Sequence, residues 1–197
     1  MIVPELDPMT QAVLLLAALA LSAAHASGQP AGMVRIQDTD TGVAIEYPAG
    51  WRVEQPGGTT PLVFSRRDPD RMLLCSVERT PDARLAAFTQ KLLDEQLVTR
   101  FRTRDWPEQL AAGRSVVDFQ VRSIGGAPMG AIAWESLEER PDRLFSEGLK
   151  VFRMTPGTLW SAECVAVAPG KTAASAHFAE HSDLLGEILR SVRFPAR

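Results

Sequence analysis

The most constraining feature of the sequence is a series of four strand-like segments joined by very short turns. The segments are residues 114–123, 127–138, 144–154 and 158–168. In the first, Val117, Phe119 and Val121 alternate with polar side chains, which is the period of a strand with one buried face. Turns of three to five residues can join only antiparallel neighbours, because a parallel crossover needs about a dozen residues or more. The sequence therefore predicts a four-stranded antiparallel meander.

Shorter strands are predicted before the meander. Residues 34–37 and 43–47 alternate apolar and polar side chains around a turn that ends at Gly42, which indicates a β-hairpin. Extended segments follow at 51–53, 62–65 and 72–78.

Three helices are expected. Thr80-Pro81-Asp82 combines a hydroxyl cap, a proline and an acidic residue, so we predict a helix from there to about Arg100. Its predicted apolar stripe is Leu85, Phe88, Leu92, Leu93 and Leu97. A short helix should open at Asp105 and stop at Gly113, and a long one should cover 172–191. The long helix should turn Ala174, Phe178, His181, Leu185, Ile188 and Val192 to the core.

These elements define a fold class. A helix with a single apolar stripe must bury that stripe, and an antiparallel sheet offers the surface to do so. The prediction is a layered α+β fold, with a sheet of about six to eight strands and helices packed on it.

The N-terminal segment has the pattern of a cleaved leader. Residues 12–24 are uncharged and mostly apolar, too few to cross a bilayer, and Ala24-His25-Ala26 matches a small-x-small cleavage site. We predict a signal peptide at 1–26, a disordered segment at 27–33 and one domain at 34–197. Translation can start at Met1 or at Met9, since Glu5 and Asp7 are unusual before a leader; a buried N-terminal helix is the alternative.

Charge and compartment narrow the class of partner. The chain has 21 basic and 24 acidic side chains, so it lacks the positive charge that nucleic acid or an anionic membrane attracts. With the leader removed, we expect no stable membrane anchor, no nucleic-acid partner and a periplasmic or secreted location. In such an oxidising compartment Cys75 and Cys164 are expected to form a disulfide, with two separate buried thiols as the alternative.

One short motif resembles a known family. The strand that ends in Tyr47-Pro48-Ala49-Gly50-Trp51 looks like the YPxGW opening of PsbP-like domains. This group includes the photosystem II PsbP subunit, a Ran-binding nuclear import factor and bacterial DcrB-type envelope proteins. The resemblance covers about residues 34–194 and implies a PsbP-like layered sandwich. The family shares no catalytic residues, so the resemblance implies an accessory or binding role. The cysteine pair is a departure from many relatives.

Two motifs near the C-terminus resemble catalytic signatures. Pro169-Gly170-Lys171-Thr172 lies where a phosphate loop would, but the first glycine of that motif is replaced by Val165, so we predict a plain turn. His177, Glu180 and His181 have the H-x-x-E-H order of inverted zinc peptidases. No third ligand follows on a later element. We therefore predict structural histidines and no metal site, with a metal-dependent hydrolase that uses His177, Glu180 and His181 as the alternative function.

Two charged stretches remain. Glu135, Glu138, Glu139 and Asp142 gather at one strand end, and we read them as a solvated turn. The most basic and aromatic stretch contains Arg100, Arg102, Arg104 and Trp106, which we predict as an interaction patch.

The functional prediction follows from export, fold and the lack of a catalytic set. We expect an exported accessory or binding protein, with no enzyme activity and no cofactor, that contacts an unknown protein or small molecule. A purely structural envelope protein is the other alternative.

Overall fold

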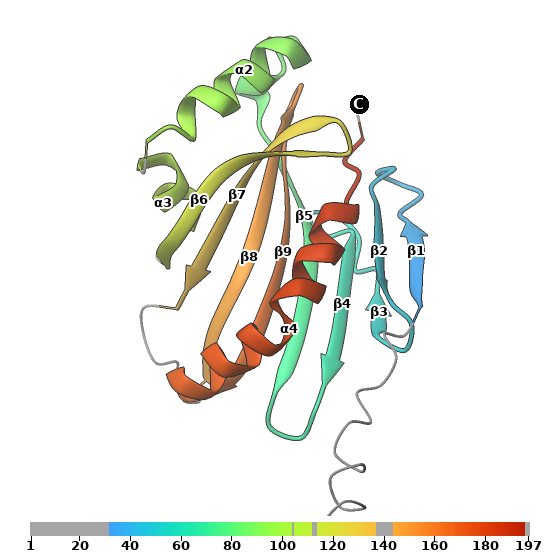
Figure 1. Cartoon of the computed structure of the whole chain (residues 1–197). Coiled ribbons are helices and arrows are strands. Elements are labelled where there is room, and N and C mark those ends of the chain that lie inside the picture. Colours follow the sequence, from blue (N-terminus) through green and yellow to red (C-terminus); the bar gives the residue numbers. More distant parts are fainter. Residues whose placement is uncertain (1–31, 104, 112–113, 137–143, 196–197) are drawn as a thin grey trace, which may run out of the picture. The chain divides into compact units, whose positions relative to one another are not determined.

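The predicted meander supplies four of the seven strands of an antiparallel sheet in the computed structural model, which describes residues 32–103, 105–111, 114–136 and 144–195. The strand order is β3-β4-β5-β9-β8-β7-β6 (Figure 1). The strands are β3 (Arg52–Glu54), β4 (Leu62–Arg67), β5 (Met72–Pro81), β6 (Ser115–Ile124), β7 (Ala127–Glu135), β8 (Leu144–Thr155) and β9 (Thr158–Pro169). The predicted α+β class and the predicted number of strands are confirmed.

The predicted hairpin forms a separate two-stranded sheet of β1 (Met33–Gln37) and β2 (Ala44–Pro48). Its turn is held by Asp38, whose carboxylate accepts hydrogen bonds from the backbone N–H and the hydroxyl of Thr41. Gly42 has a φ of 78°, as the predicted turn requires. Ala44 also exchanges backbone hydrogen bonds with Arg193, which ties the hairpin to the C-terminal segment.

The helical elements are η1 (Ala83–Leu85), α2 (Gln90–Arg100), α3 (Asp105–Ala111) and α4 (Lys171–Ser191). The predicted start of the first helix at Thr80 is wrong, because β5 continues to Pro81 and pairs there with Thr158 of β9. Asp82 caps only the single turn of η1, where its carboxylate accepts from the Arg84 N–H. The true cap of α2 is Thr89, whose hydroxyl accepts from the Leu92 N–H.

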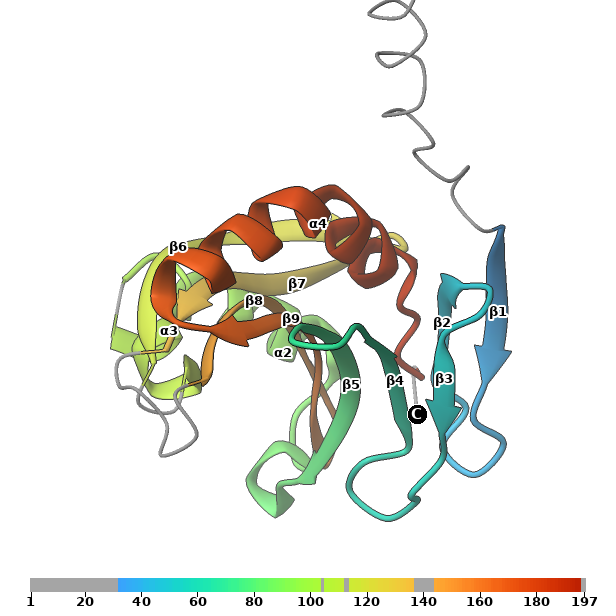
Figure 2. The same ribbon diagram turned by 90° about the horizontal axis from the view of Figure 1, so that it is seen from below.

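The sheet separates two hydrophobic cores. Successive residues of β9 point to opposite faces, so Cys164 belongs to one core while Val165 belongs to the other. The first core lies under α4, and the second lies under α2 and α3; Figure 2 shows α4 and α2 on opposite sides of the sheet. Residues 161–168 are all buried, as expected for a central strand covered on both faces.

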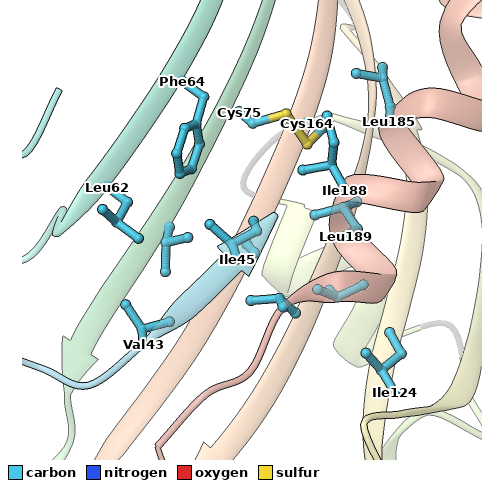
Figure 3. Close-up of a cluster of buried hydrophobic side chains, with 14 of the residues drawn as sticks. Val43, Ile45, Leu62, Phe64, Cys75, Ile124, Cys164, Leu185, Ile188 and Leu189 are labelled. Carbon is cyan, nitrogen blue, oxygen red and sulfur yellow. A yellow bond between two sulfur atoms is a disulfide. The ribbon is translucent and has the colours of Figure 1, made fainter. Parts of the chain in front are cut away.

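The two cysteines form a disulfide inside the first core. Cys75 of β5 lies directly opposite Cys164 of β9, with Cα atoms 4.1 Å apart and the sulfur atoms bonded. Figure 3 shows the bond beside Leu185 and Ile188 of α4. The expected pairing is confirmed.

Several predictions concern residues outside the described ranges. They are the signal peptide at 1–26, most of the segment at 27–33, Arg104, and the turn with Glu138, Glu139 and Asp142. In the described part, the strand β1 already begins at Met33. None of the helices there is both long and apolar enough to cross a membrane.

Candidate binding groove

The predicted interaction patch is only partly assembled. Arg100 is the last residue of α2 and Trp106 lies in the first turn of α3, and the Arg100 guanidinium carbon is 5.3 Å from the centre of the Trp106 ring. This is the distance of a cation–π contact. Arg102 is exposed and faces a different surface, beside Lys91 and Pro128, so it does not join the pair. Arg104 lies outside the described residues.

Arg100 and Trp106 line a groove of about 460 Å³. The groove runs between η1, α2, α3 and the ends of β8 and β9. We call it the α2–α3 groove, and its lining residues are Asp82, Arg84, Leu85, Phe88, Leu93, Gln96, Arg100, Trp106, Gln109, Leu110, Met154 and Leu159. A volume of this size, with mostly apolar walls and a few polar groups, is typical of a binding site.

The wall formed by Trp106 is held in place by an aromatic cluster. Phe101 caps the end of α2, and its ring meets Trp106 edge-on at 5.2 Å between centroids. The Phe101 ring also lies against Gly130 of β7, where a Cβ atom would be only 2.2 Å from its Cζ. The orientation of Trp106 therefore depends on a strand that has no side chain at this point.

The two arginines of the groove differ in their partners: Arg84 is paired with a carboxylate, and Arg100 is not. Arg84 forms a two-point ion pair with Asp82, and the hydrogen bond from Arg84 lowers the pKa of the Asp82 carboxyl. Arg100 has no carboxylate partner among the described residues, and its guanidinium group lies against the Trp106 ring. Arg100 is thus the cation of the groove that is left to attract an acidic group.

The apolar surface continues past the groove. Phe88 is 43% exposed, and Leu92 on the first turn of α2 is exposed as well. The predicted helical stripe placed both side chains in the core, which is wrong: Phe88 precedes the helix, and Leu92 lies within α2 but on its exposed side. The Thr89 cap was the signal in the sequence that could have corrected this prediction.

The other charged and polar motifs fall elsewhere. Gly170, with a φ of 77°, simply joins β9 to α4, which agrees with the predicted turn. Glu135 pairs with Lys171 at 3.1 Å. A third group, not singled out in the sequence, places Glu163 between Arg114 and Lys150 on the α2 face of the sheet, where each charge is compensated.

The two histidines and Glu180 lie together on α4. His177 is buried and His181 partly buried, whereas the sequence stripe placed His181 in the core and His177 at its margin. Four residues of the predicted stripe are buried as expected, namely Ala174, Leu185, Ile188 and Val192. The prediction is wrong only for the histidines, because His177 rather than His181 is the fully buried one.

No family model and no curated protein matches this chain. Among solved structures, it is similar to cyanobacterial PsbP from Synechocystis sp. PCC 6803, with 15% identity, 87% of this chain and 98% of that chain covered, and a TM-score of 0.46. It is also similar to LpqN of Mycobacterium tuberculosis, a protein involved in cell envelope biogenesis (11% identity, 86% and 88% covered, TM-score 0.43). A third is PA94 of Pseudomonas aeruginosa, described as a putative regulator (14% identity, 83% and 96% covered, TM-score 0.45). All three identities lie below 25% and all three TM-scores below 0.5, so these likenesses concern the arrangement of strands and helices and carry no conclusion about family or role.

Proposed function

We propose that this protein is an exported, non-catalytic binding protein and that its α2–α3 groove holds an apolar segment of a protein partner. Two observations support export: the leader pattern at 12–26 and the disulfide, a bond that persists in oxidising compartments. A non-catalytic role is supported by the lining of the groove, in which the carboxylate of Asp82 is already paired with Arg84.

The observation that carries the proposal is the stacked pair of Arg100 and Trp106 on the wall of an apolar groove. Tryptophan and arginine are the residues that most often dominate binding energies at protein interfaces. The tryptophan offers area to an apolar side chain, and the arginine without a carboxylate partner suits an acidic residue beside it.

A protein segment fits better than a compact small molecule. The groove opens onto Phe88 and Leu92, so the apolar surface extends beyond the enclosed volume. A small molecule would leave these side chains in water, whereas an amphipathic segment can cover both the groove and its edge.

Site-specific photocross-linking tests the proposal. p-Benzoylphenylalanine replaces Phe88 in the full chain, expressed in its native host and irradiated in intact cells. The matched control carries the same residue in place of Val34, which is 41% exposed. Val34 lies on β1, in the two-stranded sheet on the other side of the molecule from α2 and α3 (Figure 1). We expect a discrete protein adduct from position 88 and none of the same mass from position 34.

The Arg100→Glu change, made in the position-88 variant, identifies the groove as the site. We expect the adduct yield to fall several-fold, because the acidic residue of the bound segment would then face a like charge at position 100. Equal yields from positions 88 and 34, or an adduct indifferent to Arg100→Glu, would contradict the proposal. Cross-links to small molecules alone would show that the occupant is not a protein.

A further inference from the structure

One turn of α4 brings together three groups that can bind a metal ion. His177, Glu180 and His181 are spaced i, i+3 and i+4, so they share one side of the helix. Glu180 Oε2 lies 4.0 Å from His177 Nδ1 and 3.9 Å from His181 Nδ1, and all the candidate ligand atoms lie within 4.8 Å of one another.

His177 is the unusual member of this cluster. Its side chain is 1% exposed, yet neither ring nitrogen has a hydrogen-bond partner. A neutral imidazole has one N–H donor and one lone pair, and leaving buried polar atoms unsatisfied costs about 1–3 kcal/mol per group. A buried imidazole with a free lone pair beside a second imidazole and a carboxylate is the arrangement of a metal ligand.

Burial, chiefly, with His181 and Arg71 as further causes, lowers the pKa of the His177 ring from its usual value. Glu180 and Asp68 act in the opposite direction with smaller effect.

His181 has the second contact that a ligating imidazole usually makes. Its Nδ1 is 3.1 Å from the backbone oxygen of His177. When Nδ1 carries the proton it donates to this oxygen, and the lone pair of Nε2 is left for a metal.

One cation already lies near the carboxylate. Arg71 Nη1 is 3.5 Å from Glu180 Oε2, and its side chain is 42% exposed, so it can move into solvent when a dication takes the carboxylate. The ion pair at this exposed position is weak, and it does not block the site.

We propose that His177, Glu180 and His181 bind one Zn²⁺ ion, with water in the remaining position. Two imidazoles and one carboxylate suit Zn²⁺, whereas Ca²⁺ and Mg²⁺ prefer oxygen ligands alone. The site lies on α4, over the sheet face opposite to α2, and is independent of the α2–α3 groove.

Zinc binding to the full chain, produced without a histidine tag, tests the proposal. The protein is produced with residues 1–26 retained, so that the third of its three histidines, His25, provides a matched control. Isothermal titration with Zn²⁺ is expected to show one ion per chain for the unchanged protein and for His25→Gln. His181→Gln and Glu180→Gln are expected to bind at least about tenfold more weakly, as changes at or beside a metal ligand do.

Thermal unfolding gives a second readout and a check on folding. Zn²⁺ should raise the unfolding midpoint of the unchanged protein and of His25→Gln, and should raise that of His181→Gln much less. Both variants should keep the far-ultraviolet circular dichroism of the unchanged chain. No zinc binding by the unchanged protein, or equal affinity in His181→Gln, would overturn the site; loss in His25→Gln alone would place the ion in the N-terminal segment instead.

Discussion

Phe101 and Gly130 show how one contact fixes the wall of the α2–α3 groove. Phe101 is buried and touches Trp106, and the space for its ring exists because β7 carries no side chain at position 130. The ring would have to leave if a Cβ atom were added, and the ring is a rigid group held on several sides.

Gly130→Ala is therefore expected to destabilise the protein by about 1–3 kcal/mol, because the new methyl group overlaps Phe101. It should also weaken cross-linking from position 88, since Trp106 loses its support. Urea unfolding followed by tryptophan fluorescence measures the change in free energy.

Gly186→Ala is the matched control. It lies inside α4, where the nearest heavy atom to a new Cβ is the flexible end of Arg190 at 3.1 Å. Alanine should stabilise the helix here, by up to about 1 kcal/mol. Equal stability of Gly130→Ala and the unchanged protein would show that the Phe101 contact does not support the wall.

The strands and the long C-terminal helix could be predicted from the sequence, because each has a clear period and clear turn residues. The segment after β5 could not. Thr80-Pro81-Asp82 is a strong local helix start, but Thr80 and Pro81 are the last two partners in a ten-residue pairing with β9. The long-range strand pairing overrides the local cap, and this moves Leu85 and Phe88 out of the helix and into the α2–α3 groove.

The residues of the candidate site could be predicted from the sequence, but their arrangement in space could not. Arg100 and Trp106 were singled out by composition, but their pairing depends on the bend between α2 and α3. On α4, Ala174, Leu185, Ile188 and Val192 are buried as the helical period predicts. The period alone does not decide which of His177 and His181 is the more deeply buried.

Thr89→Ala should cost about 1 kcal/mol, because it removes the hydroxyl that accepts from the Leu92 N–H at the start of α2. Thr80→Ala should cost less, about 0.5 kcal/mol or below, because the Thr80 side chain is exposed at the end of a strand. Denaturant midpoints of the two variants check the order. A larger loss of stability in Thr80→Ala than in Thr89→Ala would instead indicate that the helix starts at Thr80.

The whole sheet is joined at its centre by the disulfide. It links β5 to β9 across 89 residues of sequence, and both cysteines are buried in the core under α4. A loop of this length would add roughly 4–5 kcal/mol to stability on the chain-entropy account, with about 2–4 kcal/mol typical of measured bonds.

Two consequences can be measured. The Cys75→Ala/Cys164→Ala variant should lose about 2–4 kcal/mol in urea unfolding. The unchanged protein should resist dithiothreitol while folded and gain two hydrogens, about 2 Da by intact mass, only in denaturant. Rapid reduction without denaturant would mean that the native core admits the reductant.

The central strand of the sheet, β9, is the last strand along the chain. During vectorial synthesis or translocation, β3–β5 and β6–β8 must therefore wait as two incomplete sheets, with the unpaired edges of β5 and β8 open to other chains. These edges close only when β9 inserts between them, and Cys75 meets its partner at the same moment. A nascent chain of this topology is therefore expected to need protection from aggregation until β9 has emerged.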